Sequence, residues 1–420
     1  MKSRILSAKI FAAASAHNRM VVHRCAIAVI FLITLFLSWT EDVQAQDALK
    51  PIRKVTVGKN RELIVNGQPF LPIMSWAQPT KNYGQLGSLG FNTHAGHADP
   101  VAAWESGAYV VPGFKEENKV HENILGWIFD DEPDMPRGKG KDAQPRQEPE
   151  SVVEKAGKIK ASDPDRLLFM TLTGHFTKEQ STYPEEFRKS IYPDFIRKTD
   201  VIGFDIYPIY GSGYASHLDW VGKGVSQLRD LGGERPVYAW IETSKGSKWM
   251  SYEKQPDVLP VHTRNEVWQA VIRGATAIGY FTHAWFPEFR EFAATADMQL
   301  ELGRLNAQLT RLAPAILAAP AKRSIEMKLG QNLNCHLKAT ESNGNIYIFA
   351  QNIDLGPGAE RARQFDPIYP RNGLATFTVE KLKAGTRIEV VDENRTITAG
   401  EGSFMDEFAP LAEHVYRFKR

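Results

Sequence analysis

Cysteine is almost absent from this chain of 420 residues, which contains only Cys25 and Cys335. Because Cys25 lies in a segment predicted below to be removed, an internal disulfide is excluded, and a hydrophobic core must hold the fold. The chain also has no large excess of positive or negative charge. Residues 1–45 hold five of the 51 Lys and Arg and two of the 49 Asp and Glu, so 46 bases and 47 acids remain. This balance excludes a nucleic-acid partner bound by bulk electrostatics.

No apolar run is long enough to predict a membrane-spanning helix. The longest covers residues 25–39, which is short of the roughly 20 residues that cross a bilayer. Basic residues precede this run, and the small residues Val43 and Ala45 follow it, as in a signal peptide cleaved before Gln46. The alternative is an uncleaved anchor. We expect a signal peptide over residues 1–45, no stable membrane insertion, and a secreted or periplasmic protein.

What the sequence does contain is a repeated alternation of apolar runs and amphipathic stretches, which is typical of a parallel sheet covered by helices. Helices are predicted over residues 150–161, 216–231 and 263–274. The alternation predicts an α/β fold, a (β/α)₈ TIM barrel. A doubly wound sheet is the alternative, but no Gly-x-Gly-x-x-Gly follows the first run. Eight runs are predicted as barrel strands: 70–76, 90–96, 108–114, 124–131, 167–173, 201–208, 236–243 and 277–285.

The pattern differs at the two ends of this region. Asn66-Gly67 stands between two apolar runs and predicts an N-terminal β-hairpin that caps the barrel floor. After residue 315, strand-like runs separated by glycine turns predict a small C-terminal antiparallel β-sandwich, with strands at 346–351, 375–380, 386–391 and 414–418. The predicted domains are therefore a catalytic barrel over residues 46–315 and a sandwich over residues 316–420.

Two predicted strands end in a carboxylate. Glu132 follows the fourth run and Glu242 ends the seventh. The carboxyl ends of barrel strands meet at one mouth, where active sites lie, and a charged group directly after apolar residues is costly unless it is paired or useful. One such residue alone could cap a helix or pair with an arginine. Two together indicate a pair of reacting carboxyl groups.

The same strands resemble those of clan A, the largest clan of (β/α)₈ glycoside hydrolases. The motif that ends in Glu132 is similar to its fourth strand, and the one that contains Glu242 to its seventh. The sixth and eighth strands, the hairpin and the C-terminal end are also similar, so the resemblance spans nearly all of the mature chain. The motifs are Trp127-Ile-Phe-Asp-Asp-Glu-Pro133, Val237-Tyr-Ala-Trp-Ile-Glu-Thr243, Val201-Ile-Gly-Phe-Asp-Ile-Tyr-Pro208, Ala277-Ile-Gly-Tyr-Phe-Thr-His-Ala-Trp285, Leu63-Ile-Val-Asn-Gly-Gln-Pro-Phe-Leu-Pro-Ile73 and Phe404-Met-Asp-Glu-Phe-Ala-Pro-Leu-Ala-Glu-His-Val-Tyr-Arg-Phe418.

The resemblance implies a retaining glycoside hydrolase that degrades a poly- or oligosaccharide by double displacement and needs no metal or organic cofactor. It implies Glu132 as acid/base, Glu242 as nucleophile, Tyr207 beside the nucleophile and Trp285 beneath the sugar. One departure is Asp131, where most of the clan has Asn. An ionised Asp only accepts hydrogen bonds, so it would take a hydroxyl proton or pair with a sugar ammonium.

Other residues near the strand ends complete the predicted site. Trp76 and Trp240 are expected to stack on sugar rings, as aromatic faces do on apolar C–H surfaces, or to fill the barrel. His94 and His97 are expected to contact sugar; with Asp130 or Asp205 they would instead favour a metal-dependent hydrolase. Asp205 is otherwise expected to support His or Arg side chains.

Basic residues follow several strands and somewhat favour an anionic polysaccharide over a neutral one. They are Arg137, Lys139, Lys141, Lys245 and Lys248, together with the two histidines. Solvated loop charge is the alternative explanation. A non-catalytic carbohydrate-binding protein on a hydrolase-like barrel is the alternative function, which the presence of both Glu132 and Glu242 disfavours. The sugar, the linkage, endo or exo action and the oligomeric state stay open.

Overall fold

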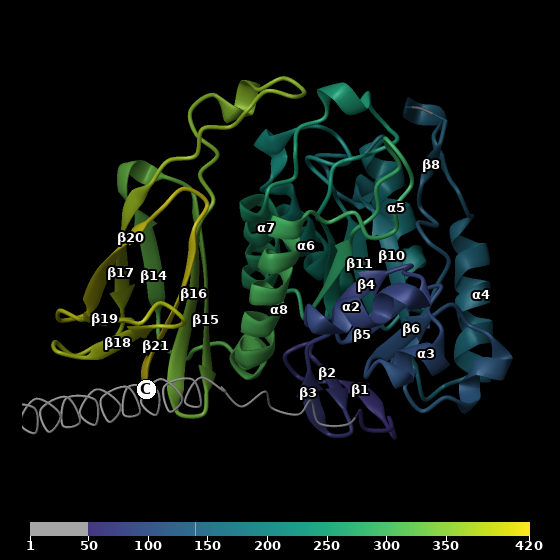
Figure 1. Cartoon of the computed structure of the whole chain (residues 1–420), viewed down its shortest axis with the longest axis horizontal. Coiled ribbons are helices and arrows are strands. Elements are labelled where there is room, and N and C mark those ends of the chain that lie inside the picture. Colours follow the sequence, from purple (N-terminus) through teal and green to yellow (C-terminus); the bar gives the residue numbers. More distant parts are fainter. Residues whose placement is uncertain (1–48, 139) are drawn as a thin grey trace, which may run out of the picture. The chain divides into compact units, whose positions relative to one another are not determined.

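The computed structural model describes residues 49–138 and 140–420 (Figure 1). The predicted signal peptide lies outside the described residues. Within the described part of the chain, no helix is both long and apolar enough to cross a membrane.

An eight-stranded parallel sheet forms the centre of the described chain, in the order β6-β5-β4-β13-β12-β11-β10-β7. Parallel bridges from Val110 to Ile124 and from Gly113 to Ile128 join the two ends of this order, so the sheet closes into a barrel. Each of the eight predicted runs contains one strand, which confirms the barrel. The strands are β4 (Ile73–Trp76), β5 (Thr93–Gly96), β6 (Tyr109–Pro112), β7 (Gly126–Ile128), β10 (Leu167–Thr173), β11 (Val201–Asp205), β12 (Val237–Glu242) and β13 (Ala277–Phe281).

Helices surround the barrel because each strand is apolar on both faces. In β12, Tyr238 and Trp240 pack inside the barrel, while Val237, Ala239 and Ile241 pack outward against the helices. The three predicted helices are confirmed as α4, α6 and α7, although α6 begins at Trp220. The helices are α2 (Tyr83–Ser88), α3 (Pro100–Glu105), α4 (Pro149–Ser162), α5 (Glu185–Ile196), α6 (Trp220–Gly232), α7 (Pro260–Arg273) and α8 (Ala296–Ile316).

The predicted hairpin closes the amino-terminal end of the barrel. Strands β2 (Leu63–Val65) and β3 (Gln68–Phe70) pair with β1 (Val55–Val57) in a three-stranded sheet. Asn66 and Gly67 both have positive φ, 50° and 81°, as a type I′ turn requires. Side chains of β1 and β2 pack against the interior residues of the barrel strands, so the hairpin forms its floor.

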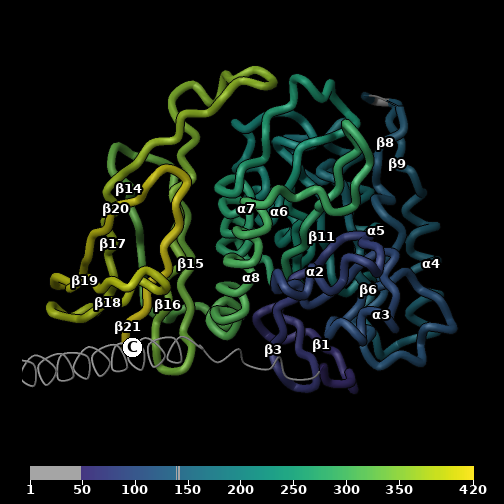
Figure 2. Tube along the Cα trace, in the orientation of Figure 1, coloured from purple at the N-terminus to yellow at the C-terminus, as the bar shows by residue number. Residues whose placement is uncertain are grey.

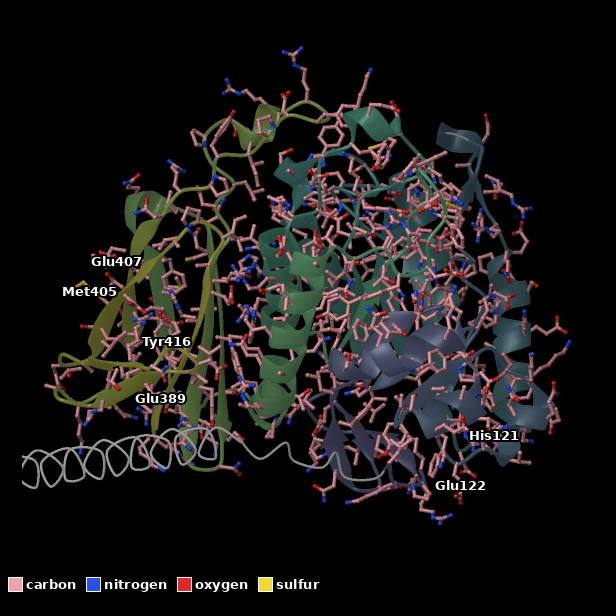
Figure 3. All side chains as sticks on the ribbon, viewed as in Figure 1. His121, Glu122, Glu389, Met405, Glu407 and Tyr416 are labelled. Atoms are coloured by element: carbon pink, nitrogen blue, oxygen red, sulfur yellow. The ribbon has the colours of Figure 1, made fainter. Side chains whose placement is uncertain are left out.

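Two antiparallel sheets follow α8, which confirms the predicted sandwich (Figure 2). Phe377, Phe404 and Tyr416 pack together in its core; Tyr416 is buried and Met405 is 57% exposed, and both are labelled in Figure 3. One sheet contains β14 (Ile325–Leu329), β17 (Gly373–Val379) and β20 (Ser403–Phe408). The other contains β15 (Cys335–Ser342), β16 (Asn345–Asn352), β18 (Arg387–Val390), β19 (Arg395–Thr398) and β21 (Glu413–Lys419).

Polar contacts tie α7 to the larger C-terminal sheet. The backbone carbonyl of Asn265 accepts a hydrogen bond from Gln351 at 2.8 Å, and Arg264 pairs with Glu413 at 3.2 Å. Farther along, the N–H of Phe365 donates to the carbonyl of Gly213 at 2.8 Å. The segment between β16 and β17 thus reaches the loop that follows β11 at the mouth of the barrel.

Candidate active site

A cavity of about 810 Å³ opens at the carboxyl-terminal ends of the barrel strands. Its lining comes from the residues that end or directly follow seven of the eight strands, which is where reacting groups lie in barrels of this kind. The chemically distinctive members are Trp76, His97, Asp130, Asp131, Glu132, Asp205, Tyr207, Trp240, Lys248, Trp249, His283, Trp285 and Glu291.

All nine predicted site residues are among the described ones, and seven of them line this cavity. His94 and Glu242 are the two that do not. The seven are Trp76, His97, Asp131, Glu132, Tyr207, Trp240 and Trp285. Residues that were predicted from the carboxyl ends of the strands therefore meet in one cavity, although they are far apart in the sequence.

Glu132 is held in an unusual backbone conformation. Its φ is 48°, and the φ of Ala77 across the cavity is 45°. Non-glycine residues in this left-handed region cost about 1–3 kcal/mol each, and such strain concentrates at functional sites. The carboxylate pairs with Arg146 at 3.2 Å, and its side chain is 17% exposed. The fold therefore places an accessible carboxylate at the barrel mouth, on a residue whose backbone is strained.

Asp205, at the end of β11, lies against Glu132. The two carboxyl groups are within hydrogen-bonding reach, and Oδ1 of Asp205 is buried without a hydrogen-bond partner among the described residues. Burial, and then the charges of Glu132 and Asp131, raise the pKa of Asp205 well above its usual range. The neighbours of Asp205 are thus carboxyl groups rather than the His or Arg side chains that the sequence suggested.

Asp131 also faces this group. Its side chain is exposed to the cavity, yet desolvation by the surrounding protein, followed by the charge of Glu132, raises its pKa to about 7. A carboxyl group with a raised pKa keeps its proton to a higher pH than an ordinary Asp, and in its protonated form it can donate as well as accept a hydrogen bond.

Asp134 is a member of the site that the sequence did not reveal. It is fully buried and accepts hydrogen bonds from the backbone N–H and hydroxyl of Thr173, at 2.9 and 2.7 Å, and from the hydroxyl of Tyr192 at 2.7 Å. Burial raises its pKa to about 6. Asp134 anchors the turn that carries Glu132 to the end of β10. The signal in the sequence was the fourth acid of Asp130-Asp-Glu-Pro-Asp134.

Removing this anchor is expected to lower the stability of the fold. Asp134→Ala would leave three buried donors without an acceptor, which is expected to cost about 2–4 kcal/mol of unfolding free energy. Urea denaturation measures the loss, with Asp142→Ala, an exposed acid of the same loop, as the control. Equal stability of the two variants would contradict this role of Asp134.

Glu242 ends β12 as predicted, but its carboxylate binds backbone. It is fully buried, and its two oxygens accept hydrogen bonds from the N–H groups of Ile209 at 2.9 Å and Tyr210 at 2.6 Å. Glu266 of α7 is its other partner. Burial raises the pKa of Glu242 to about 7, and burial and Glu242 together raise that of Glu266 well above its usual range. The pair holds the loop after β11 over the end of β12.

The two predicted histidines point to different places. His94 is buried, stacks on Tyr83 with ring centroids 3.9 Å apart, and bonds to the hydroxyl of Ser75 at 2.8 Å. His97 lines the cavity. Among the described residues, no group of three or more His, Cys, Asp or Glu is placed to hold a metal ion. The His-x-x-His spacing therefore does not bring its two rings to one point.

Aromatic side chains form the walls and floor of the cavity. The ring of Trp76 lies 5.1 Å from that of Trp240, and Trp285 lies 4.9 Å from Phe289. Lys248 sits over Trp285 at 4.4 Å, and it is the one Lys or Arg among the described lining residues. These surfaces suit the apolar faces of sugar rings.

A search of solved structures finds similar chains. A glycoside hydrolase family 5 protein from Bacteroides vulgatus superposes with a TM-score of 0.51 at 11% identity, over 87% of this chain and 94% of that chain. The α-amylase of Geobacillus thermoleovorans gives 0.45 at 8% identity, over 83% and 98%. A glucosidase from Croceicoccus marinus gives 0.45 at 10%, over 89% and 98%. No protein-family model and no curated protein sequence matches the chain. At 11% identity the first likeness shows the barrel fold.

Proposed function

We propose that this protein is an exported glycoside hydrolase that cleaves a poly- or oligosaccharide by double displacement, with Glu132 as a reacting group. The observation that carries the proposal is the Glu132 carboxylate, which a residue with a strained backbone places in an aromatic-walled cavity at the barrel mouth. A fold alone does not define a reaction. The support comes from the combination of carboxyl groups, which glycoside hydrolysis needs, with indole rings that stack on sugars.

The sequence pairs Glu132 as acid/base with Glu242 as nucleophile. Retaining enzymes hold their two carboxyl groups roughly 5–5.5 Å apart on either side of the scissile bond. For Glu242 to act in this way, its oxygens would have to leave the N–H groups of Ile209 and Tyr210 and reach the cavity. This pairing therefore requires the loop after β11 to move.

The lining holds no cluster of basic groups for the anionic polysaccharide expected from the sequence. Lys248 is the one Lys or Arg among the described lining residues, beside five carboxyl groups. Three of these have cations of their own: Asp130 pairs with Lys155, Glu132 with Arg146 and Glu291 with Lys81. Lys245, one of the predicted basic residues, instead pairs with Asp257 at 3.4 Å. A neutral sugar, or one whose ammonium group could pair with Asp131, therefore suits this lining better than a uronate or sulfate.

Release of sugars from a polysaccharide panel tests the proposal. The panel contains neutral, amino-sugar and anionic glycans, and mass spectrometry with reducing-end assays detects the products. We expect release from at least one neutral or amino-sugar glycan. Binding to a glycan without release would support the carbohydrate-binding alternative, and neither binding nor release would contradict both.

The export part of the proposal predicts the mature N-terminus. When the full chain is expressed with an active secretion system, the recovered protein is expected to begin at Gln46 and to stay in solution without detergent. N-terminal sequencing checks this. A product that retains residues 25–39 and sediments with membranes would indicate an anchor instead.

A further inference from the structure

Three carboxyl groups are candidates for the partner of Glu132 in the reaction: Glu242, Asp131 and Asp205. Asp130 and Glu291 also line the cavity, but they pair with Lys155 and Lys81. Glu242 is fully buried and holds two backbone N–H groups. Asp131 follows the same strand as Glu132, so it does not face it across the barrel. Asp205 ends β11, lines the cavity and lies within hydrogen-bonding reach of Glu132. Of the three, Asp205 approaches Glu132 from another strand and is open to the cavity.

The surroundings of the two carboxyl groups differ in charge. Glu132 has a counterion, Arg146, at 3.2 Å. Asp205 has none among the described residues, and its Oδ1 is buried without a donor. The titratable and charged groups facing Asp205 are Asp131, Glu132, Asp134, Tyr207 and Tyr238, with Arg146 behind Glu132. An acid amid other acids keeps its proton to a higher pH, so Asp205 is suited to be the proton donor.

We propose that Asp205 is the acid/base catalyst and that Glu132 is the nucleophile. The inference rests on the proposed function and reverses the role that the sequence gives to Glu132. The carboxyl group without a counterion serves as the acid, and the neighbouring carboxylate that pairs with an arginine serves as the nucleophile.

The reaction balances with these two groups and water. A Glu132 oxygen forms a bond to the anomeric carbon as the glycosidic C–O bond breaks, and the leaving oxygen takes that electron pair together with the Asp205 proton. Water then attacks the glycosyl ester, gives a proton to the Asp205 carboxylate, and returns the ester electron pair to Glu132. A sugar that enters between the two carboxyl groups must part them to the roughly 5–5.5 Å that a retaining enzyme needs, and it replaces their mutual contact with contacts to its own atoms.

The test compares Asp205→Asn with the wild type on two substrates of the sugar identified by the panel. One is the natural glycan, and the other is a dinitrophenyl glycoside, whose leaving group needs no proton. We expect kcat on the glycan to fall about 10²–10⁴-fold, the usual contribution of general acid catalysis. With Asp205→Asn, the first turnover should still release dinitrophenol. Added azide should give a glycosyl azide of retained configuration. The decrease in activity at alkaline pH should disappear from the pH profile, because the variant has no acid to lose its proton.

Asp200→Asn is the matched control, because Asp200 pairs with Lys160 at the opposite end of β11. Glu242→Gln is measured beside it. Wild-type activity of Asp205→Asn on both substrates would overturn the inference, as would an equal loss on both in a variant that unfolds like the wild type. If Glu242→Gln yields the azide of inverted configuration, Glu242 is the nucleophile and the inference fails while the proposed function stands. A wild type that cleaves no glycoside would contradict the proposed function itself.

Discussion

Glu132→Gln is expected to abolish turnover of the natural glycan and of activated aryl glycosides alike. A missing nucleophile cannot be replaced by a better leaving group, and such losses are roughly 10⁵–10⁶-fold in kcat. The measurement is steady-state release of dinitrophenol together with reducing ends. In Glu132→Ala, which leaves room in place of the carboxylate, azide should restore turnover and give a glycosyl azide of inverted configuration, because azide attacks directly from the vacated face.

Glu150→Gln is the control for this variant, since it makes the same change at an exposed residue of the first turn of α4. In the wild type, a 2-fluoro glycoside of the same sugar should leave an ester on the peptide that contains Glu132. If Glu132→Gln still cleaves dinitrophenyl glycosides and gives the azide of retained configuration, Glu132 is the acid/base, as the sequence suggested. An ester on Glu242 would lead to the same conclusion.

The barrel could be predicted because its strands are buried on both faces. All seven residues of β10 are buried, and such a continuous apolar run stands out in a sequence. Strands of the C-terminal sheets were harder to find. In β14 and β19, partly buried residues alternate with exposed ones, and the sequence Cys335–Ser342 of β15 mixes charged and apolar residues. Four of the eight sandwich strands were therefore not predicted.

The candidate site was predicted only as far as strand ends define it. The rule that reacting groups lie at the carboxyl ends found Glu132 and the tryptophans. This rule could not show that the loop after β11 directs two backbone N–H groups toward Glu242. The path of a loop depends on contacts between residues that are distant in the sequence, such as the hydrogen bond between Gly213 and Phe365. The contact of Asp205 with Glu132 likewise depends on strand register in the closed barrel.

The buried pair of Glu242 and Glu266 predicts an unusual dependence of stability on pH. Burial raises the pKa of Glu242 from 4.5 to about 7. Between these values the folded protein keeps a proton that the unfolded chain has lost, so the unfolding free energy decreases as pH rises. Glu266→Gln removes the second buried carboxyl group, whose pKa burial and Glu242 raise well above its usual range, and it supplies a neutral N–H donor to Glu242.

At pH 8 we expect Glu266→Gln to be more stable than the wild type by more than about 1.4 kcal/mol, which corresponds to one pKa unit, because the variant lacks a buried carboxyl group whose pKa is raised well above its usual range. At pH 4.5, where the wild-type pair is protonated, the two should be nearly equal. Urea denaturation at both pH values measures the difference, with Glu186→Gln as an exposed control on α5. If the unfolding free energies of Glu266→Gln and the wild type differ by the same small amount at both pH values, Glu242 and Glu266 do not take up a proton on folding. Glu242 would then be an ionised carboxylate, which is the state that a nucleophile needs. Its role as a structural residue that binds the loop after β11 would have to be revised.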